Sequence, residues 1–231
     1  MTADDKLGEA VASGDASSVN AGHDPTRRGI LFVVSSPSGG GKGTLIRRVV
    51  GSVPELVYSV SWTTRGPRAG ERHGVNYFFA TVEEFERMRE AGGFLEWAVV
   101  HGNLYGTSRE FVESEQRVGR DVVLEIDVQG AESVRRAAKE SVSVFILPPS
   151  YEVLRERLSG RQTETARDFT VRLRNARGEV ARYTEFDYLV LNDEVERAAA
   201  QLASIVYAER ARRERQEALA RRVLATFPAE G

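Results

Sequence analysis

Short apolar runs rich in β-branched residues alternate with amphipathic segments along most of this chain. Runs at 30–34, 122–127, 142–147 and 188–191 predict buried strands of a parallel sheet. The segments between them carry apolar residues at helical spacing, so we expect helices there. Strands that alternate with helices form a parallel sheet covered by helices on both faces. The pattern therefore predicts an α/β fold.

Polar and turn-forming residues mark where these helices begin and end. Ser108 and Ser150 each precede an amphipathic segment and are expected N-caps, and Gly119 and Gly160 follow the ends of those segments. The expected helices lie at 45–50, 109–118, 131–139, 151–158 and 161–177, and residues 194–224 predict one long helix.

Residues 59–108 have a different pattern. Short alternating stretches such as 77–79 are separated by Gly-rich turns, and one helical segment at 82–91 carries Phe85 and Met88 at helical spacing. We therefore expect a small β-rich insertion within the α/β frame.

The chain divides into a frame at 28–224 and two terminal segments. Residues 1–27 are rich in Ala, Ser, Gly and Asp without apolar periodicity, and they predict a disordered tail. Within the frame, the core comprises 28–58, 109–160 and 179–210, the β-rich insertion 59–108 and a polar, Arg-rich helical segment 161–178, and a basic helical extension and tail occupy 211–231.

Composition limits the class of protein. The chain has 231 residues, 41% of them hydrophobic, which suffices for one sizeable domain with a buried core. The net charge of −2 gives no general reason to expect a nucleic acid as partner. The absence of cysteine excludes disulfides and favours a reducing compartment. Without a membrane-length apolar run or a signal-peptide pattern, we expect a soluble cytoplasmic protein that binds no membrane.

A Gly-rich loop with a lysine follows the first predicted strand and precedes a helix, which is the context that a phosphate-binding P-loop requires. Glycines let backbone N–H groups turn toward a phosphate, and the helix N-terminus adds partial positive charge. Lys42 can reach the outer phosphates of a nucleotide. The residues of the expected ATP-binding loop are Pro37, Ser38, Gly39, Gly40, Gly41, Lys42, Gly43 and Thr44.

The loop departs from the pattern G-x-x-x-x-G-K-[ST] at both ends. Ser36 stands at the first glycine, a mild change if its backbone conformation is ordinary. Gly43 stands where a hydroxyl usually ligates magnesium. The candidate replacements are Thr44, or Glu125 or Asp127 through water. The alternative interpretation, a Gly/Ser linker with a chance lysine, is not favoured by the flanking strand and helix.

Two arginines, Arg65 and Arg68, flank a proline turn and predict a second phosphate clamp, because guanidinium groups suit bidentate recognition of phosphate. A chain with two phosphate sites suggests phosphoryl transfer between nucleotides, although an Arg-rich surface loop with a Glu partner is the simpler alternative. Ligands of parallel sheets lie beyond the carboxyl ends of the strands. The P-loop, Glu125, Asp127 and Asn192 should therefore converge there.

Other charged residues suggest no further site. The basic run at 210–222 predicts a solvated, ion-paired helix face rather than a nucleic-acid site. His23, His73 and His101 are too scattered for a metal site, and each is expected in a turn or in solvent.

Several motifs together resemble the guanylate kinase family, in order and at family-like spacing from about 29 to 209. They are T-T-R-x-P-R-x-G-E at 63–71, N-Y at 76–77, F-L-E-W at 94–97, G-N-L-Y-G-T at 102–107, E-I-D-V-Q-G at 125–130, P-P-S at 148–150, R-Q-T-E-T at 161–165 and N-D at 192–193.

The resemblance implies a P-loop NTPase-type sheet flanked by helices, with a GMP-binding region at 59–108 and a helical lid at 161–178. It implies in-line phosphoryl transfer from ATP, with magnesium, to GMP and dGMP. The GMP phosphate would be held by Arg65, Arg68 and Tyr77, with Tyr105 also contributing. The base would be read by Ser61, Glu96, Thr107 and Asp127. Glu71 and Glu125 would be the further residues of the GMP-binding site. The catalytic residues would be Lys42, Arg65, Arg157, Arg161 and Arg172, with Asn192 near the adenine.

Residue chemistry supports the assignment of the base. Guanine offers two adjacent N–H donors and one acceptor, O6, which match the carboxylate of Glu96 and a hydroxyl from Ser61 or Thr107. Adenine lacks this donor pair, so a buried carboxylate would stay unsatisfied. The alternative for Glu96 is an exposed strand position beside a packed Trp97.

Two further departures from the family pattern are Glu125, where aspartate is common, and Gln162, where glycine usually follows the lid arginine. Three other functions are possible on sequence alone. They are a kinase for another phosphorylated acceptor such as a ribose bisphosphate, a non-catalytic phosphopeptide-binding module, and a nucleic-acid binder that uses the basic helix. Oligomeric state is not determined by the sequence.

Overall fold

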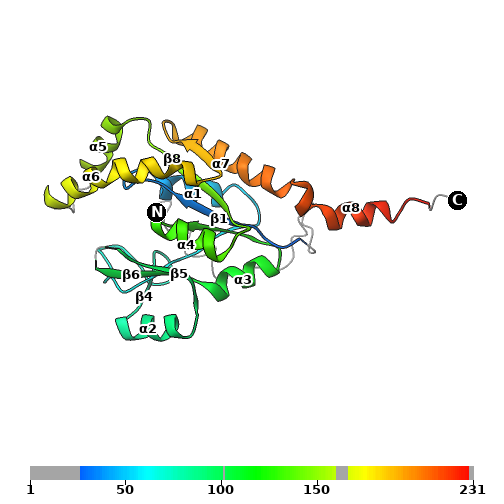
Figure 1. Cartoon of the computed structure of the whole chain (residues 1–231), viewed down its shortest axis with the longest axis horizontal. Helices are drawn as coiled ribbons and strands as arrows, with labels where there is room; N and C mark the ends of the chain where they lie inside the picture. Colours follow the sequence, from blue (N-terminus) through cyan, green and yellow to red (C-terminus); the bar gives the residue numbers. More distant parts are fainter. Residues whose placement is uncertain (1–26, 101, 160–165, 229–231) are drawn as a thin grey trace.

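The central sheet of the computed structural model has five parallel strands in the order β2-β7-β1-β8-β9 (Figure 1). The structure describes residues 27–100, 102–159 and 166–228, with side chains of 166–170 excepted. The predicted α/β fold is confirmed, and four strands, β1, β7, β8 and β9, lie within a residue or two of the expected runs. The strands are β1 (Leu31–Ser35), β2 (Leu56–Tyr58), β7 (Asp121–Glu125), β8 (Val142–Leu147) and β9 (Tyr188–Leu191).

Helices cover both faces of this sheet, which explains why its strands are continuous apolar runs. On one face, α1 (Lys42–Val50) and α7 (Val195–Arg210) pack over Phe32 and Val34 of β1. On the other, α3 (Arg109–Arg117) and α4 (Val128–Ala137) pack over Leu31 and Val33. Successive residues of β1 therefore enter two different hydrophobic cores. Figure 1 shows α3 and α4 on the side of the sheet opposite α7.

A second, four-stranded sheet lies within the insertion, in the order β4-β3-β6-β5. Helix α2 (Val82–Glu90) packs beside it and begins with a capping box formed by Thr81 and Glu84. Phe85 of α2 stacks on Phe94 with ring centroids 4.3 Å apart. The strands are β3 (Trp62–Thr63), β4 (Phe78–Phe79), β5 (Phe94–Val100) and β6 (Asn103–Ser108).

The prediction of one long C-terminal helix is wrong. Helix α7 ends at Arg210, a short 3₁₀ turn follows at Arg213–Arg215, and α8 (Glu217–Leu224) extends away from the body (Figure 1). The break has a local cause. Gln216 Nε2 donates to the Arg210 carbonyl, and the buried Glu209 accepts from Arg215, so the chain folds back on the end of α7.

Two remaining helices, α5 (Tyr151–Ser159) and α6 (Ala166–Ala181), form a pair outside the sheet, and a 3₁₀ turn at Arg182–Glu185 follows. The expected N-caps Ser108 and Ser150 each accept a hydrogen bond from a backbone amide in the first turn. Helix α4 begins three residues earlier than predicted, because Asp127 caps it. Expectations for 1–26, His23, His101 and Arg161 fall outside the described residues. None of the described helices is long and apolar enough to cross a lipid bilayer.

Asp121 closes the sheet at its amino edge, opposite the P-loop. Its carboxylate is fully buried and accepts hydrogen bonds from Arg27 Nη1, Ile30 N and Arg210 Nε, each at 2.7 Å. The basic run is therefore only partly a solvated face, since Arg210 is tied to a buried carboxylate. This one side chain joins the start of β1, the start of β7 and the end of α7.

We expect Asp121→Ala to lower the free energy of unfolding by about 3 kcal/mol, because two guanidinium groups and one amide would lose a buried acceptor. Urea denaturation measures this. Glu217→Ala removes an exposed ion pair with Arg221 on α8 and serves as the control, with a nearly unchanged midpoint. Equal midpoints for the two variants would contradict the role of Asp121.

Candidate active site

The predicted site residues meet at the carboxyl edge of the central sheet. Asn192, just after β9, donates from Nδ2 to the carbonyl of Gly40 at 2.8 Å. Glu125, at the end of β7, places Oε1 4.0 Å from Lys42 Nζ. Because β1 lies between β7 and β8, the loop after β1 is flanked by the ends of its neighbours. The expected convergence is confirmed for the P-loop, Glu125 and Asn192.

The loop after β1 turns through two glycines with left-handed backbone conformations, Gly39 (φ 84°) and Gly41 (φ 85°). A Cβ on Gly41 would stand 2.4 Å from Asn192 Nδ2, and one on Gly39 would stand 2.9 Å from a methyl group of Leu158. Ser36 is not among the residues with positive φ, and its side chain lies against Gly40. The substitution of serine for the first glycine is therefore accommodated without strain.

Helix α1 begins directly after this loop with free backbone donors. Gly41 is the N-cap, no side chain caps the helix, and its first turn contains no acidic residue. The first N–H groups and the positive end of the helix dipole are therefore open to an anion. The strand, loop and helix of a P-loop are confirmed.

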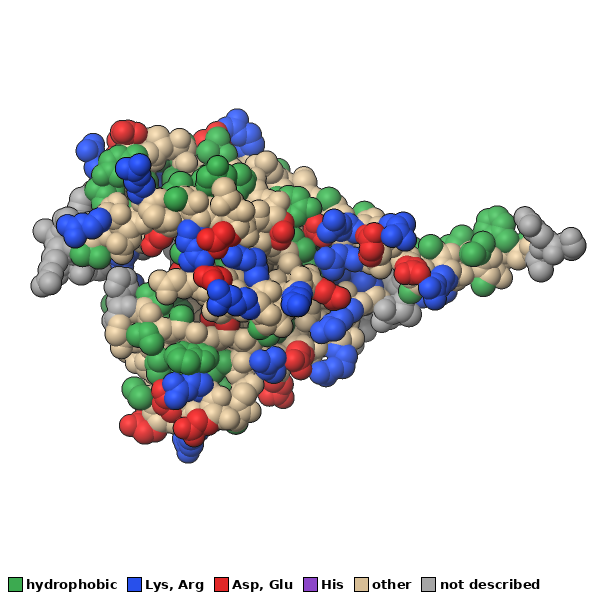
Figure 2. Space-filling view, viewed as in Figure 1, with side chains coloured by type: hydrophobic (Ala, Val, Ile, Leu, Met, Phe, Trp, Pro, Cys, Tyr) green, Lys and Arg blue, Asp and Glu red, His purple; other side chains and the backbone are tan. Residues whose placement is uncertain are grey.

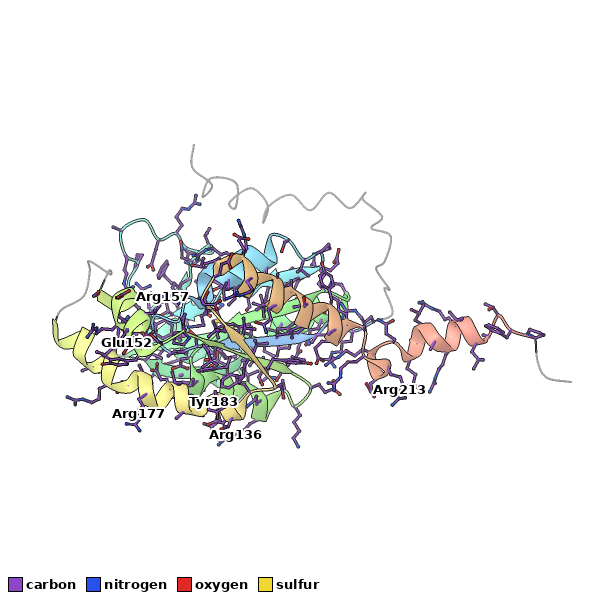
Figure 3. The ribbon with its side chains drawn as sticks, turned by 90° about the horizontal axis from the view of Figure 1, so that it is seen from above. Arg136, Glu152, Arg157, Arg177, Tyr183 and Arg213 are labelled. Carbon is purple, nitrogen blue, oxygen red and sulfur yellow. The ribbon has the colours of Figure 1, made fainter. Side chains whose placement is uncertain are left out.

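Arg157 on α5, labelled in Figure 3, lies close to this loop. Its Nη2 donates to the Asn192 carbonyl at 2.9 Å, while Nη1 is buried with no hydrogen-bond partner among the described residues. Nη1 also lies 3.8 Å from where a Cβ of Gly41 would stand. A buried guanidinium nitrogen left unpaired beside a P-loop is a donor available to a phosphate.

Helix α6 contacts the same loop through two side chains. Glu179 Oε2 accepts from the amide of Ser38 at 2.9 Å, and Arg172 Nη1 lies 3.5 Å from Ser38 Oγ. These contacts join the base of the expected lid to the P-loop. Glu179 was not predicted, since a single carboxylate in a polar helix carries no sequence signal.

The expected guanine-binding carboxylate is buried. Glu96 on β5 is 8% exposed, and its Oε1 accepts from Thr107 Oγ1 at 2.7 Å. Burial, opposed by that hydrogen bond, raises the pKa of Glu96 to about 7, and Asp127 adds to the rise. The alternative of an exposed Glu96 beside a packed Trp97 is therefore wrong, because Trp97 is the exposed residue of the two.

Gly130 makes room for the side chains of Asp127 and Glu96. A Cβ at this position would stand 3.2 Å from Asp127 Oδ1 and 3.3 Å from Glu96 Oε2. Asp127 Oδ1 also accepts from the amide of Gly130 at 2.8 Å, as the cap of α4. Ser61 is half-buried near the same sheet, and its carbonyl accepts from Phe78 N at 2.9 Å.

The expected second phosphate clamp is organised around an ion pair. Arg65 Nη2 donates to both oxygens of Glu71, at 2.8 and 2.9 Å, and its guanidinium lies 5.2 Å from the ring centre of Tyr77. The ring of Tyr105 contacts that of Tyr77 edge-on at 5.9 Å. Glu71 also accepts from the amide of Arg68, whose side chain is exposed. Glu71 therefore holds the arginines in place.

Glu125 lies between the two halves of the site. Its Oε2 is 3.5 Å from the hydroxyl of Tyr58, a residue that the sequence did not single out. Burial, together with the charge of Glu125, raises the pKa of Tyr58, which keeps this hydroxyl protonated. A Cβ on Gly43 would stand 3.1 Å from each oxygen of Glu125.

Oxygen donors at this edge suit magnesium, which prefers carboxylates, hydroxyls and phosphates. Among the described residues there is no group of three or more His, Cys, Asp or Glu side chains that could hold a metal by themselves. A magnesium ion that arrives with nucleotide phosphates fits this donor set, because such sites supply only one or two protein oxygens.

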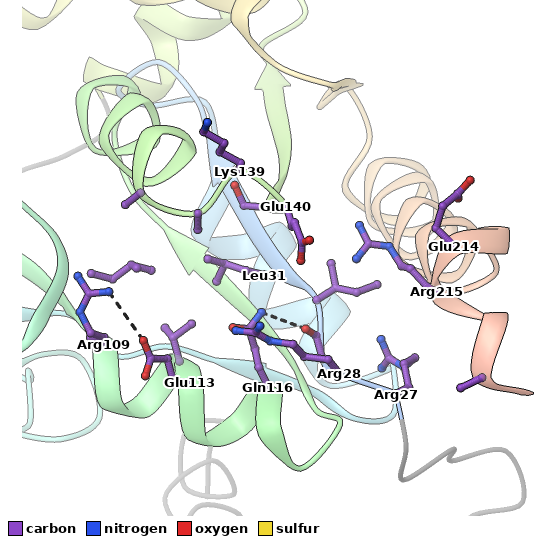
Figure 4. Close-up of a pocket in the computed structure, with 18 residues that line it drawn as sticks. Arg27, Arg28, Leu31, Arg109, Glu113, Gln116, Lys139, Glu140, Glu214 and Arg215 are labelled. Carbon is purple, nitrogen blue, oxygen red and sulfur yellow. Dashed lines mark hydrogen bonds and ion pairs between the residues drawn. The ribbon is translucent and has the colours of Figure 1, made fainter.

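The molecule has further hollows that contain none of the predicted site residues. In the space-filling view, the insertion and the α5–α6 pair form two lobes separated by an opening (Figure 2). A cavity of about 510 Å³ lies instead near the amino edge of the sheet (Figure 4). Its lining mixes acidic and basic side chains such as Glu113 with Arg109 and Glu214 with Arg215, so it does not form a uniform anion site.

The comparisons with known proteins agree with this geometry. The sequence model of the family described as guanylate kinase matches residues 28–209. The guanylate kinase of Thermotoga maritima is 50% identical over 80% of this chain and 89% of its own length. That of Geobacter sulfurreducens is 45% identical over 80% of this chain and 92% of its own. The crystal structure of guanylate kinase from Anaplasma phagocytophilum superposes with a TM-score of 0.75, at 34% identity, covering 89% of this chain and 98% of that one.

The raised pKa of Glu96 predicts how stability depends on pH. Its ordinary value is 4.5, so between pH 4.5 and about 7 the folded protein binds more protons than the unfolded chain. The free energy of unfolding that protonated Glu96 contributes is therefore lost as the pH rises from 4.5 through about 7. We expect ligand-free wild type to lose roughly 2 kcal/mol relative to Glu96→Gln between pH 5 and 8.

Chemical denaturation across this pH range measures the difference, with Glu110→Gln on the exposed surface of α3 as a control that should follow wild type. Parallel pH profiles for wild type and Glu96→Gln would contradict the buried, proton-binding carboxylate.

Proposed function

Because the chain belongs to the guanylate kinase family and catalyses the ATP-dependent phosphorylation of GMP to GDP, we propose that its two substrates bind at separate sites at the carboxyl edge of the sheet. The family assignment leaves no support for the three alternatives, a ribose bisphosphate kinase, a phosphopeptide-binding module and a nucleic-acid binder. The observation that carries the residue assignment is the buried Glu96, which has one described donor, Thr107, for its two oxygens.

On the acceptor side, we assign the recognition of guanine to Glu96. Its carboxylate would accept the N1–H and N2–H donors of the base, which lie side by side. The Thr107 hydroxyl already donates its proton to Glu96, so the donor to O6 is assigned to Ser61. Asp127, beside Glu96 across Gly130, is available to the second N2 proton. Adenine has no donor pair at this edge, so AMP would leave a buried carboxylate unsatisfied.

The GMP phosphate is assigned to Arg65 and Arg68, with the hydroxyls of Tyr77 and Tyr105. Arg65 is held rigidly by Glu71, while the guanidinium of Arg68 has no hydrogen-bond partner within the described part of the chain. Burial raises the pKa of Tyr77, so its hydroxyl stays protonated and able to donate. This arrangement gives a dianion two cationic and two neutral donors.

On the donor side, the P-loop amides and Lys42 would hold the ATP phosphates. When bound with ATP, magnesium would supply positive charge to the donor phosphates. Arg157 Nη1, buried and unpaired, would donate to the transferring phosphoryl group, and Arg161 and Arg172 of the lid would join it. Asn192 braces Gly40, so we assign its side chain first to the shape of the P-loop and then to contact with the adenine.

Transfer between two bound nucleotides mainly requires positioning, charge stabilisation and exclusion of water. The opening between the insertion and the α5–α6 pair is the space that both nucleotides would fill (Figure 2). We therefore propose that 59–108 and the lid at 161–178 move toward each other on binding. The absence of cysteine and the nature of the substrates favour the cytoplasm as the place of reaction.

We expect turnover with ATP and magnesium to be far faster with GMP and dGMP than with AMP, UMP or ribose bisphosphate, and AMP to support only a low rate. Lys42→Ala should lower kcat at least 100-fold because charge at the donor phosphates is lost. Glu96→Gln should lower kcat/KM for GMP by about 100-fold and leave the low rate with AMP nearly unchanged. A coupled assay of ADP release measures both. Equal losses with GMP and AMP would contradict the role of Glu96 in choosing the base.

Binding of both nucleotides should also compact the protein. Small-angle scattering should show a smaller radius of gyration with a non-hydrolysable ATP analogue and GMP together than with either alone, because each nucleotide closes one lobe. An unchanged radius with both present would contradict closure.

A further inference from the structure

Helix α6 holds the first turn of the P-loop through one carboxylate. Residues 37–40 form a β-turn, in which Gly40 N donates to the Pro37 carbonyl at 2.9 Å. The amide of Ser38, the second residue of this turn, takes no part in that hydrogen bond. Glu179 Oε2, which is 141 residues away in the chain, accepts from this amide at 2.9 Å. The hydrogen bonding of the turn is therefore completed from α6.

Two side chains from distant parts of the chain fix this turn at two points. Glu179 binds the amide of Ser38, and Asn192 Nδ2 donates to the carbonyl of Gly40 at 2.8 Å. Among the described residues, Ser38 N is the one hydrogen-bond donor to Glu179, and no cation there forms an ion pair with it. A carboxylate beside an anion-binding loop repels phosphates. The place of Glu179 is therefore explained by its hold on the loop rather than by contact with a ligand.

The same face of α6 carries a second charged side chain that reaches the loop. Arg172 and Glu179 lie on one face, because residues seven apart are separated by about two helical turns. Ala176, which lies between them, is 1% exposed and packs in the small core between α5 and α6. Arg172 Nη1 lies 3.5 Å from Ser38 Oγ, so both charged side chains of this face approach the same P-loop residue.

The C-terminal end of α6 is anchored to the core of the protein. In the 3₁₀ turn that follows α6, Arg182 Nη2 donates to Glu132 Oε2 of α4 at 2.7 Å, and Glu185 Oε2 accepts from Arg135 of α4 at 2.7 Å. Glu179 lies about one turn before this anchor, and Arg172 lies about 10 Å further along the helix axis. The contact of Glu179 with the P-loop therefore sets the angle at which the Arg172 end of α6 approaches the phosphates.

We propose that Glu179 is a positioning residue for phosphoryl transfer, which binds the Ser38 amide and so fixes α6 against the P-loop with Arg172 directed at the donor phosphates. In the ligand-free protein Arg172 lies near Ser38 Oγ, and a phosphate in the loop would offer its guanidinium a charged and therefore stronger acceptor. Without Glu179 the arginine would occupy more positions, and fewer of them would be productive. This inference rests on the proposed function, which assigns Arg172 to the transferring group.

Kinetics of the variants test the positioning role. We expect Glu179→Ala to slow phosphoryl transfer in a single turnover about tenfold and to change the KM for GMP less than about twofold, because the acceptor site is untouched. Glu179→Gln keeps an oxygen that can accept from Ser38 N, so its rate should return to within about threefold of wild type. Rapid-quench measurement gives these rates, and Glu156→Ala, which removes an exposed carboxylate of α5, is the control with unchanged kinetics. A wild-type rate in Glu179→Ala would overturn the proposal.

A double-mutant cycle separates positioning from a loss of structure. If Glu179 acts through Arg172, Glu179→Ala should slow transfer less than about twofold in an Arg172→Ala background, against about tenfold in the wild-type background. A purely structural effect would slow both backgrounds by the same factor, and that result would overturn the proposal. If Glu179→Ala does not fold, as thermal unfolding shows, Glu179→Asp takes its place, because it keeps the charge and shortens the side chain by one methylene.

Hydrogen exchange tests the contact itself. The Ser38 amide, followed by NMR, should exchange about tenfold more slowly in wild type and Glu179→Gln than in Glu179→Ala. Equal exchange in wild type and Glu179→Ala would overturn the proposal.

GMP turnover by wild type separates this inference from the proposed function. Turnover with GMP together with equal effects of Glu179→Ala in both backgrounds overturns the positioning role and leaves the function standing. Absence of GMP turnover overturns the function.

Discussion

The whole structure depends on keeping strongly polar groups unpaired at one edge of a buried sheet. The amides that begin α1, Arg157 Nη1 and the carboxylate of Glu96 all lack a full set of partners among the described residues, and the last two are buried. Each such group costs stability until a ligand satisfies it. The amides of α1 and Arg157 lack acceptors, so they select phosphates. The carboxylate of Glu96 lacks donors, so it selects a base rich in N–H groups.

The rest of the fold stabilises that edge. Two hydrophobic cores on opposite faces fix the strands, so the loop after β1 is presented in one conformation. Asn192 and Leu158 pack against its glycines, and Asp121 joins β1, β7 and α7 at the other end of the sheet. Unmet polarity at the carboxyl edge is therefore tolerated because the two hydrophobic cores and the hydrogen bonds of Asp121 hold the sheet together.

Sequence reasoning succeeded where the signal was local. The strands β7, β8 and β9 are runs of apolar residues bounded by turns, and the P-loop has its glycines and lysine in sequence. It missed β2, whose three residues are too few to show a period, and it missed the break after α7, which depends on the buried Glu209. The contact of Gly43 with Glu125 joins two motifs far apart in the chain, so each departure looked like an isolated defect until the sheet brought them together.

The central claim is that the buried carboxylate of Glu96 accepts the N–H donors of guanine. It is tested most directly by measuring the number of protons released when GMP binds. At pH 7 the pKa of about 7 leaves Glu96 roughly half protonated, and donors from guanine would favour its ionised form. Calorimetry of GMP binding in buffers of different ionisation enthalpy gives the number of protons released, and Glu96→Gln corrects for the phosphate group. The account predicts that wild type releases about half a proton more per GMP than Glu96→Gln. Equal proton release by the two proteins would contradict it.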